Sequence, residues 1–167
     1  GLRAVYFALD AFARYDFDIR FDDPRLEPFW SRVDAWKLPV FFEAPPTPGY
    51  DHASYVRNMV GLRTLMDRYP NIRWVLVMGP PVGLFGRSRR WEFPEEVLAA
   101  YRHPNLWIEV MFPITWGGHW DYPYPEAQEL IRGMRDLFGA GKLVWGSDAP
   151  NVERFCTYKQ SLDYVRN

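Results

Sequence analysis

The sequence lacks several features that would mark a secreted or nucleic-acid-binding protein. The chain of 167 residues has one cysteine, three histidines and a formal net charge of −1. A single cysteine cannot form an internal disulfide, so nothing in the sequence indicates an oxidising compartment. The 20 Lys and Arg residues balance the 21 Asp and Glu residues. No field of one sign therefore favours nucleic acid or an anionic membrane as a partner.

Long hydrophobic runs are also missing. No apolar run approaches the roughly 18 residues of a membrane-spanning helix, and the start of the chain lacks the pattern of a cleavable signal. We therefore expect a cytoplasmic protein that contacts neither membrane nor nucleic acid. Aromatic residues are abundant, with 8 Trp, 10 Tyr and 12 Phe. This composition suits a large core and an aromatic-lined pocket for a small-molecule substrate.

Five short apolar runs recur along the chain, and a helical pattern follows each of them. The predicted strands are residues 2–7, 38–43, 73–78, 105–110 and 143–146, and the predicted helices are residues 23–36, 53–69, 94–101, 126–138 and 152–167. Such alternation predicts parallel strands joined by right-handed helical crossovers. Because the strands are continuous apolar runs, we expect a sheet that is covered on both faces.

The segments that follow strands are long, whereas the turns that precede strands are short. The long ones are residues 44–51, 79–91 and 112–125. Long loops after strands build the active-site rim of α/β barrels, so a partial TIM-type barrel of about five βα units is expected. A complete barrel needs at least about 200 residues. No linker divides the sequence, which predicts a single domain over residues 1–167.

The most informative segment is KLVWGSDAP, residues 142–150. Its apolar run stops at Gly146, and Asp148 follows at the carboxyl end of the predicted strand. Barrel enzymes keep their catalytic groups at this end. A carboxylate there can bind a metal or move a proton. The alternative is that Asp148 only caps the next helix or bonds to loop amides.

Two other carboxylates belong to predicted strands. Glu43 ends an apolar run, where an unpaired carboxylate would be costly, so it needs a partner or a wet pocket. A salt bridge to an arginine and a catalytic role are both open. Glu109 lies within a strand and points either into the barrel mouth, where substrate binds, or towards the helices.

The long loops supply further candidates for substrate contacts. His119 and Trp116 lie together on an aromatic-rich loop, and His119 is either a proton carrier or substrate contact, or a packed histidine without a role. Arg89 and Arg90 belong to a basic cluster on another loop. Such clusters are often only solvated, but these guanidinium groups could bind a substrate carboxylate in a bidentate manner.

Several segments, taken in order, resemble the amidohydrolase-related family of the metal-dependent hydrolase superfamily. They are DDPRLEPFW, LPVFFEA, MDRYPNIRWVLVMGPP, HPNLWIEV and KLVWGSDAP. The resemblance implies a (β/α)₈ barrel of which this chain would hold the last five βα units. Gly1 begins almost directly in a strand, which fits a fragment. Members of the family include hydrolases, lactonases and decarboxylases that act on small, often aromatic, carboxylated substrates.

The resemblance also implies a divalent metal, but this chain departs from the family's ligand pattern. The usual H-x-H pair belongs to a first strand that is not in this chain. Two later histidine positions are Glu43 and Met78, and only the aspartate, Asp148, is kept. A thioether is a poor ligand for such an ion, which counts against the usual zinc site. Asp148 and Glu43 remain candidate ligands for Zn²⁺ or Mn²⁺.

Two functional hypotheses follow from these residues. In the first, the protein is a hydrolase, or a lyase of the decarboxylase or lactonase type, with Asp148 as the general base and Glu43 as a second acid/base group. Arg89 or Arg90 would orient a substrate anion. In the second, a catalytically silent barrel binds an aromatic ligand or a partner protein through its rim loops. The open edges of five strands also predict a homo-oligomer or a missing half of the barrel.

Overall fold

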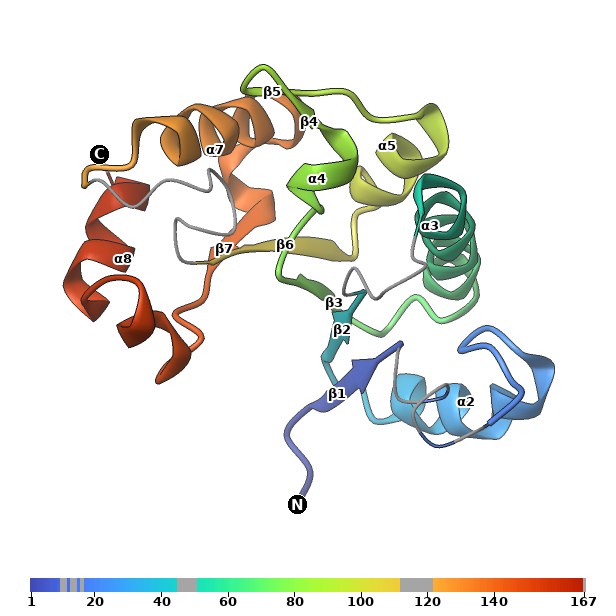
Figure 1. Ribbon diagram of the computed structural model, residues 1–167. Coiled ribbons are helices and arrows are strands. Elements are labelled where there is room, and N and C mark those ends of the chain that lie inside the picture. The colour runs from blue at the N-terminus through green and yellow to red at the C-terminus, as the bar shows by residue number, and fades with distance from the viewer. Residues whose placement is uncertain (10–11, 13–14, 16, 45–50, 112–121, 167) are drawn as a thin grey trace. The chain divides into compact units, whose positions relative to one another are not determined.

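One parallel sheet organises the chain, and a helical segment follows each of its strands (Figure 1). The computed structural model describes residues 1–9, 12, 15, 17–44, 51–111 and 122–166. The strands stand in the order β1 (Val5–Ala8), β2 (Val40–Glu43), β3 (Trp74–Val77), β6 (Leu106–Val110) and β7 (Leu143–Trp145). This confirms the predicted parallel α/β fold. Because β1 and β7 end the order, they are the two edges of the sheet.

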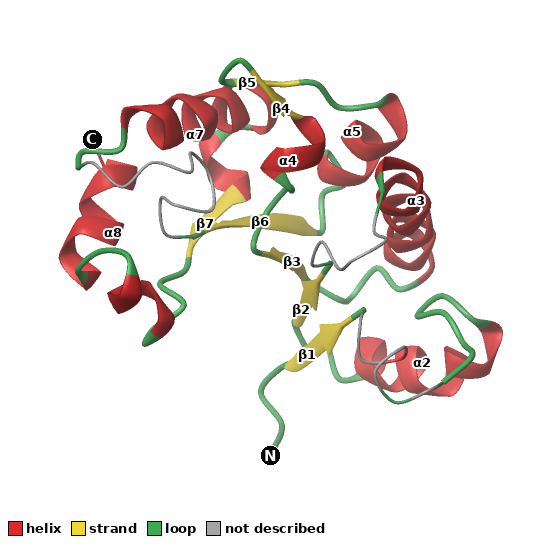
Figure 2. Ribbon diagram, viewed as in Figure 1, coloured by secondary structure: helices red, strands yellow, loops and turns green. Residues whose placement is uncertain are grey.

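The helices between the strands match the predicted ones closely (Figure 2). The longer ones are α2 (Glu27–Ala35), α3 (His52–Arg68), α5 (Glu95–Tyr101), α7 (Pro125–Phe138) and α8 (Tyr158–Arg166). Short 3₁₀ turns are η1 (Pro24–Leu26), η2 (Ala140–Lys142) and η3 (Asn151–Arg154). None of the helices in the described ranges is long and apolar enough to cross a membrane.

The chain divides into two compact units. The first unit comprises Gly1–Val77 and Pro94–Trp107, and the second comprises Met78–Phe93 and Ile108–Asn167. Each unit is described below by itself. The single domain expected from the sequence stays a prediction.

In the first unit, side-chain caps fix where the helical segments begin. The Asp51 carboxylate accepts a hydrogen bond from the Ser54 amide at 2.8 Å and so caps α3. Asp23 accepts one from the Arg25 amide at 2.9 Å, and Pro24 follows it at the first helical position. The Arg25 guanidinium, which bonds the same carboxylate, lowers the pKa of Asp23 to about 2. The predicted aspartate-proline start is confirmed, because the acceptor and the proline satisfy the free amides of a helix start.

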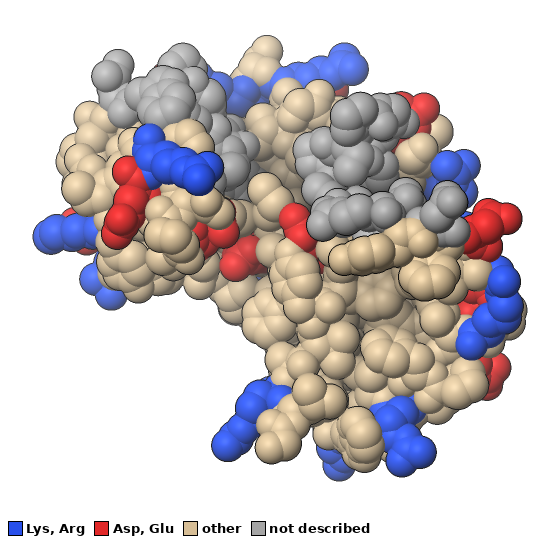
Figure 3. Space-filling model, turned by 60° about the horizontal axis from the view of Figure 1, so that its bottom comes forward, with Lys and Arg blue, Asp and Glu red and all other residues tan. Residues whose placement is uncertain are grey.

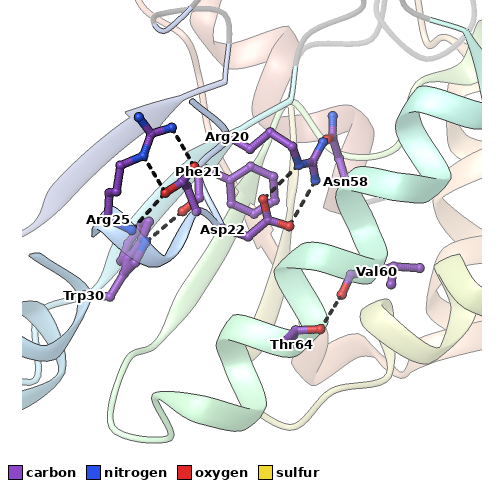
Figure 4. Close-up of polar contacts among 9 residues, drawn as sticks. Arg20, Phe21, Asp22, Arg25, Trp30, Asn58, Val60 and Thr64 are labelled. Carbon is purple, nitrogen blue, oxygen red and sulfur yellow. Dashed lines mark hydrogen bonds and ion pairs between the residues drawn. The ribbon is translucent and has the colours of Figure 1, made fainter. Parts of the chain in front are cut away.

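A polar cluster and an aromatic core hold the segment before η1 against α3 (Figure 4). The Arg20 guanidinium bonds both carboxylate oxygens of Asp22 and the side-chain oxygen of Asn58. Gly61 allows this approach, since a Cβ there would lie 3.1 Å from both the Asp22 Cγ and the Phe21 ring. The aromatic part includes Trp30, whose indole N–H donates a hydrogen bond to the Phe21 carbonyl oxygen at 2.8 Å.

The two faces of the strands in the first unit differ in burial. Phe42 is fully buried, whereas its neighbour Phe41 is 37% exposed. Strand register places Tyr6, Phe41 and Val75 in one row across β1, β2 and β3. Tyr6 is 61% exposed in that row, and Val75 is half-buried. The Phe42 face is therefore the more buried one, and a sheet covered on both faces stays a prediction.

In the second unit, the segment after β3 is not the featureless loop that the sequence predicted. It contains a short helix, α4 (Val82–Phe85), and a hairpin of β4 (Gly86–Arg87) and β5 (Arg90–Trp91). Ser88 and Arg89 form the turn with φ values of 48° and 65°. Two-residue hairpin turns need positive φ at both positions and usually contain Asn-Gly. The sequence signal was missed because Ser-Arg replaces that pair.

The last predicted helix is divided into η3 and α8. Thr157 and Gln160 explain where the second part begins: the Gln160 side chain accepts from the Thr157 amide at 2.9 Å, and the Thr157 hydroxyl accepts from the Gln160 amide at 3.2 Å. This reciprocal pair is a capping box. The Thr-x-x-Gln pattern was visible in the sequence and would have predicted the break.

Charged side chains of both signs are interspersed on the face shown in Figure 3. Several exposed ion pairs join residues of the same unit, such as Arg68 with Glu27 at 2.7 Å. Exposed pairs of this kind contribute about 0–1 kcal/mol each. They are therefore minor terms in the stability of the fold.

Candidate active site

Asp148 lies on an exposed turn beyond the carboxyl end of β7. Its backbone has φ 51°, a left-handed conformation that is uncommon outside glycine. Its carbonyl oxygen accepts a hydrogen bond from the Val152 amide at 3.2 Å. No described residue forms a hydrogen bond or ion pair with its carboxylate, and the cap position of η3 is Pro150. The helix-capping alternative therefore finds no support, and the carboxylate faces solvent with its acceptor sites open.

Glu109 joins three segments of the second unit, its own strand and the residues Met78 and Gly146. It lies on β6 and accepts a hydrogen bond from the Met78 amide, directly after β3, at 3.0 Å. Its side chain also crosses the end of β7, because a Cβ on Gly146 would lie 2.7 Å from the Glu109 Cδ. Gly146 thus provides the room for the carboxylate two residues before Asp148. The sequence placed Glu109 in a strand but gave no signal for these contacts.

The backbone of Met78 explains why an acceptor at this position stabilises the fold. Met78 and Gly79 have φ values of 63° and 60°, so two consecutive residues adopt the left-handed conformation. A bulky residue in this conformation costs about 1–3 kcal/mol and persists only when its surroundings enforce it. The hydrogen bond to Glu109 is one such constraint. The Met78 backbone is therefore held by the Glu109 carboxylate.

Glu43 belongs to the first unit, at the carboxyl end of β2. It is partly buried and accepts a hydrogen bond from the Tyr6 hydroxyl on β1. No arginine in the described ranges forms a salt bridge with it, so the partner required by its position is a tyrosine. The salt bridge to an arginine is not found among the described residues. The catalytic role of Glu43 stays a prediction.

The two candidate arginines differ in their contacts. Arg89, in the hairpin turn, forms ion pairs with Glu126 at 2.9 Å and with Glu129 at 3.5 Å, both on α7. These pairs fix the hairpin to α7. Arg90 is exposed and has no ion pair with a described residue. If one of the two meets a substrate anion, Arg90 is the one with a guanidinium free to do so.

Two predicted substrate contacts, Trp116 and His119, lie outside the described residues. Cys156 is buried in the second unit, and burial raises the pKa of its thiol despite a hydrogen bond with Tyr124 that lowers it. A protonated, buried thiol is a poor nucleophile at neutral pH. Cys156 is therefore not among the candidates for covalent catalysis.

A metal site cannot be assembled from the described residues alone. No three His, Cys, Asp or Glu side chains among them come together as ligands. Asp148 could supply one carboxylate, and Glu43 belongs to the other unit. A closed zinc site takes four ligands and a catalytic one three. The described residues therefore do not form a complete metal site, and the proposed reaction assigns no step to a metal ion.

The contact between Glu109 and Gly146 leads to a prediction. Gly146→Ala should destabilise the protein by about 1–3 kcal/mol, because the new Cβ displaces Glu109 and the Met78 amide loses an acceptor. In a Glu109→Ala background the same change should cost less than about 0.5 kcal/mol, since the clash is gone. Urea unfolding of the four proteins in this double-mutant cycle gives the coupling energy. Additive effects would show that the two residues do not constrain each other.

Comparison with known proteins bears on the family. A family model described as amidohydrolase matches residues 13–166. L-Fucono-1,5-lactonase of Burkholderia ambifaria is 34% identical over 134 residues, which make up 77% of this chain and 40% of the lactonase. This chain therefore spans less than half the length of that curated relative.

Solved structures bear on the fold. A probable 2-pyrone-4,6-dicarboxylic acid hydrolase of Acinetobacter baumannii, crystallised with citric acid, superposes with a TM-score of 0.65 at 19% identity, covering 99% of this chain and 57% of that one. An amidohydrolase of Burkholderia multivorans with bound zinc superposes with a TM-score of 0.62 at 15% identity, covering 99% and 56%. The sheet and its helices are thus part of a TIM-type barrel. With the family model matching residues 13–166, the chain belongs to the amidohydrolase family.

Proposed function

We propose that the protein hydrolyses a small lactone at the carboxyl ends of its strands, with Asp148 as the general base. The observation that carries this proposal is the Asp148 carboxylate, which is exposed after β7 without a partner among the described residues and on a left-handed backbone. Strained backbone at such a position is a recurrent property of functional sites. The likeness to a fucono-lactonase supports a lactone as the substrate class.

In the proposed step, the Asp148 carboxylate accepts a proton from a water molecule as the water oxygen attacks the lactone carbonyl. The bond between the carbonyl carbon and the ring oxygen then breaks, and the ring oxygen takes up the proton that Asp148 had accepted, which restores the carboxylate. The product is an open hydroxy acid, which ionises and releases one proton per turnover. A general base within hydrogen-bond reach of the water contributes about 10²- to 10⁴-fold to such a step.

The other residues have supporting roles in the proposal. Glu109 keeps the turns after β3 and β7 in place through Met78 and Gly146. Arg90 would bind a substrate anion, while Glu43 would serve as a second acid/base group or as a ligand of a divalent ion completed by the whole protein. Trp116 and His119 remain proposed substrate contacts, as does Glu109.

Proton release from a panel of substrates tests the proposal. We expect sugar 1,5-lactones and 1,4-lactones to be hydrolysed with a kcat/KM at least about tenfold above that for amides or aromatic carboxylates, after subtraction of spontaneous lactone opening. A pH-indicator assay measures this directly, because each opening releases one proton. Preferential turnover of amides or aromatic acids would contradict the lactonase assignment. Tight binding without turnover of any panel member would favour the catalytically silent barrel.

A further inference from the structure

The second unit contains a cavity whose described lining does not include Asp148. It has a volume of about 340 Å³, is partly open to solvent and is lined by β7, α7 and α8, with Val110 of β6 at one wall. This size lies in the range of small-molecule sites. Nothing in the proposed hydrolysis uses this cavity.

The cavity has a strongly positive lining. Of its twelve lining residues, three are arginines (Arg132, Arg135 and Arg166) and none is acidic. Arg135 forms an ion pair with Asp136 at 2.8 Å. Arg132 and Arg166 have no ion pair or hydrogen bond with a described residue. Two guanidinium groups that have no counter-ion among the described residues attract an anion beside the cavity. Each can bind the anion through a fork of N–H donors.

The wall of the cavity is apolar and held in place. Trp145 and Ile131 belong to it, together with Tyr164. The Trp145 indole donates to the Ser161 carbonyl at 2.9 Å and meets the Tyr158 ring edge-on, with 5.3 Å between the ring centres. The Tyr164 hydroxyl donates to the Met111 carbonyl. Fixed aromatic rings present a flat surface at little entropic cost to a ring that binds against them.

The cavity extends along the whole of β7. Its lining includes all three residues of that strand, Leu143–Trp145, and Val110 of β6, which pairs with Trp145 at the carboxyl ends of the two strands. Arg135 and Arg166 lie in the last turns of α7 and α8. Asp148 is not among the described residues that line the cavity.

We propose that this cavity binds a small aromatic carboxylate. Its ring would lie against Trp145 and Ile131, and its carboxylate would bind the guanidinium groups of Arg132 and Arg166. The apolar wall distinguishes this ligand from an inorganic anion, and the unpaired arginines distinguish it from a neutral aromatic compound. The inference does not depend on the proposed lactonase activity.

Benzoate serves as the probe, with benzamide as its neutral counterpart and inorganic phosphate as an anion without a ring. Calorimetric titration of the purified protein should show saturable benzoate binding and at least tenfold weaker binding of the other two. In a ¹⁵N–¹H spectrum, the Trp145 indole signal, identified with Trp145→Phe, should shift on addition of benzoate. Phosphate that binds as tightly as benzoate, or an indole signal that does not move, overturns the proposal.

Substitutions distinguish benzoate binding in this cavity from benzoate binding near Asp148. Arg132→Gln combined with Arg166→Gln should weaken benzoate binding at least tenfold, because the carboxylate then loses its charge-assisted hydrogen bonds. Arg63→Gln, an exposed arginine on α3, is the matched control and should leave the affinity unchanged. The Trp145 shift should persist in Asp148→Asn. Loss of the Trp145 shift in Asp148→Asn would place benzoate near Asp148 and contradict the inference. Failure of lactone hydrolysis would leave the inference unaffected, because the two proposals concern different residues.

Discussion

Asp148→Asn is expected to lower kcat/KM for lactone hydrolysis by about 10²- to 10⁴-fold, the contribution of a general base. Asparagine has nearly the same shape, but its amide cannot accept a proton from water at neutral pH. The unfolding free energy should change by less than about 0.5 kcal/mol, because the exposed carboxylate has no partner among the described residues. Activity is measured by proton release, and stability by urea unfolding of the same preparations.

The control for this result is Asp67→Asn, which removes an exposed carboxylate of α3 in the other unit. It should leave the rate unchanged and lower the stability by no more than about 1 kcal/mol, because Asp67 is itself exposed in its pairs with Arg63 and His103. Asp148→Glu keeps a carboxylate but moves it by one methylene, so its rate should fall between those of the parent and Asp148→Asn. Full activity of Asp148→Asn would assign the base to another residue and leave Asp148 as a turn residue.

Local sequence signals predicted the elements of this fold where they act within one turn of the chain. The helix starts at Asp23-Pro24 and Asp51 were foreseeable because a side-chain acceptor and a proline act on amides one to three residues away. The capping box of Thr157 and Gln160 carried an equally local signal. The hairpin at Ser88-Arg89 carried no such local signal. Its turn is held by ion pairs from Arg89 to Glu126 and Glu129 of α7, which lie 37 and 40 residues further along the chain.

The candidate site was predictable in a similar, partial way. The position of Asp148 after a strand followed from the apolar run that precedes it, since parallel strands end on a common rim. The contacts of Glu109 with Met78 and Gly146 did not follow, because they join three segments that only the folded sheet brings together. For the same reason, the sequence predicted only that Glu43 has a partner or lines a wet pocket, whereas the structure shows a hydrogen bond from the Tyr6 hydroxyl.

Apolar runs are the least informative signal about which side of a strand is buried. Phe41 and Phe42 are identical in type and adjacent in β2, yet their side chains point to opposite faces. Phe42 packs against Phe21, Phe7 and Trp74, with ring centres 5.1, 6.1 and 6.1 Å away. Phe41 lies in the Tyr6 row on the more exposed face. Sequence hydrophobicity cannot distinguish the two residues, but stability can.

Phe42→Ala is therefore expected to reduce the unfolding free energy by about 3–5 kcal/mol, the cost of removing a buried aromatic ring and leaving a cavity. Phe41→Ala, the matched control one residue away, should cost less than about 1.5 kcal/mol, because its ring is already partly in water. Urea unfolding at several protein concentrations measures both. Equal costs would contradict the assignment of faces. If the cost of Phe41→Ala rose with protein concentration, a second copy of the chain would be covering the Tyr6 row, as the open sheet edges predict.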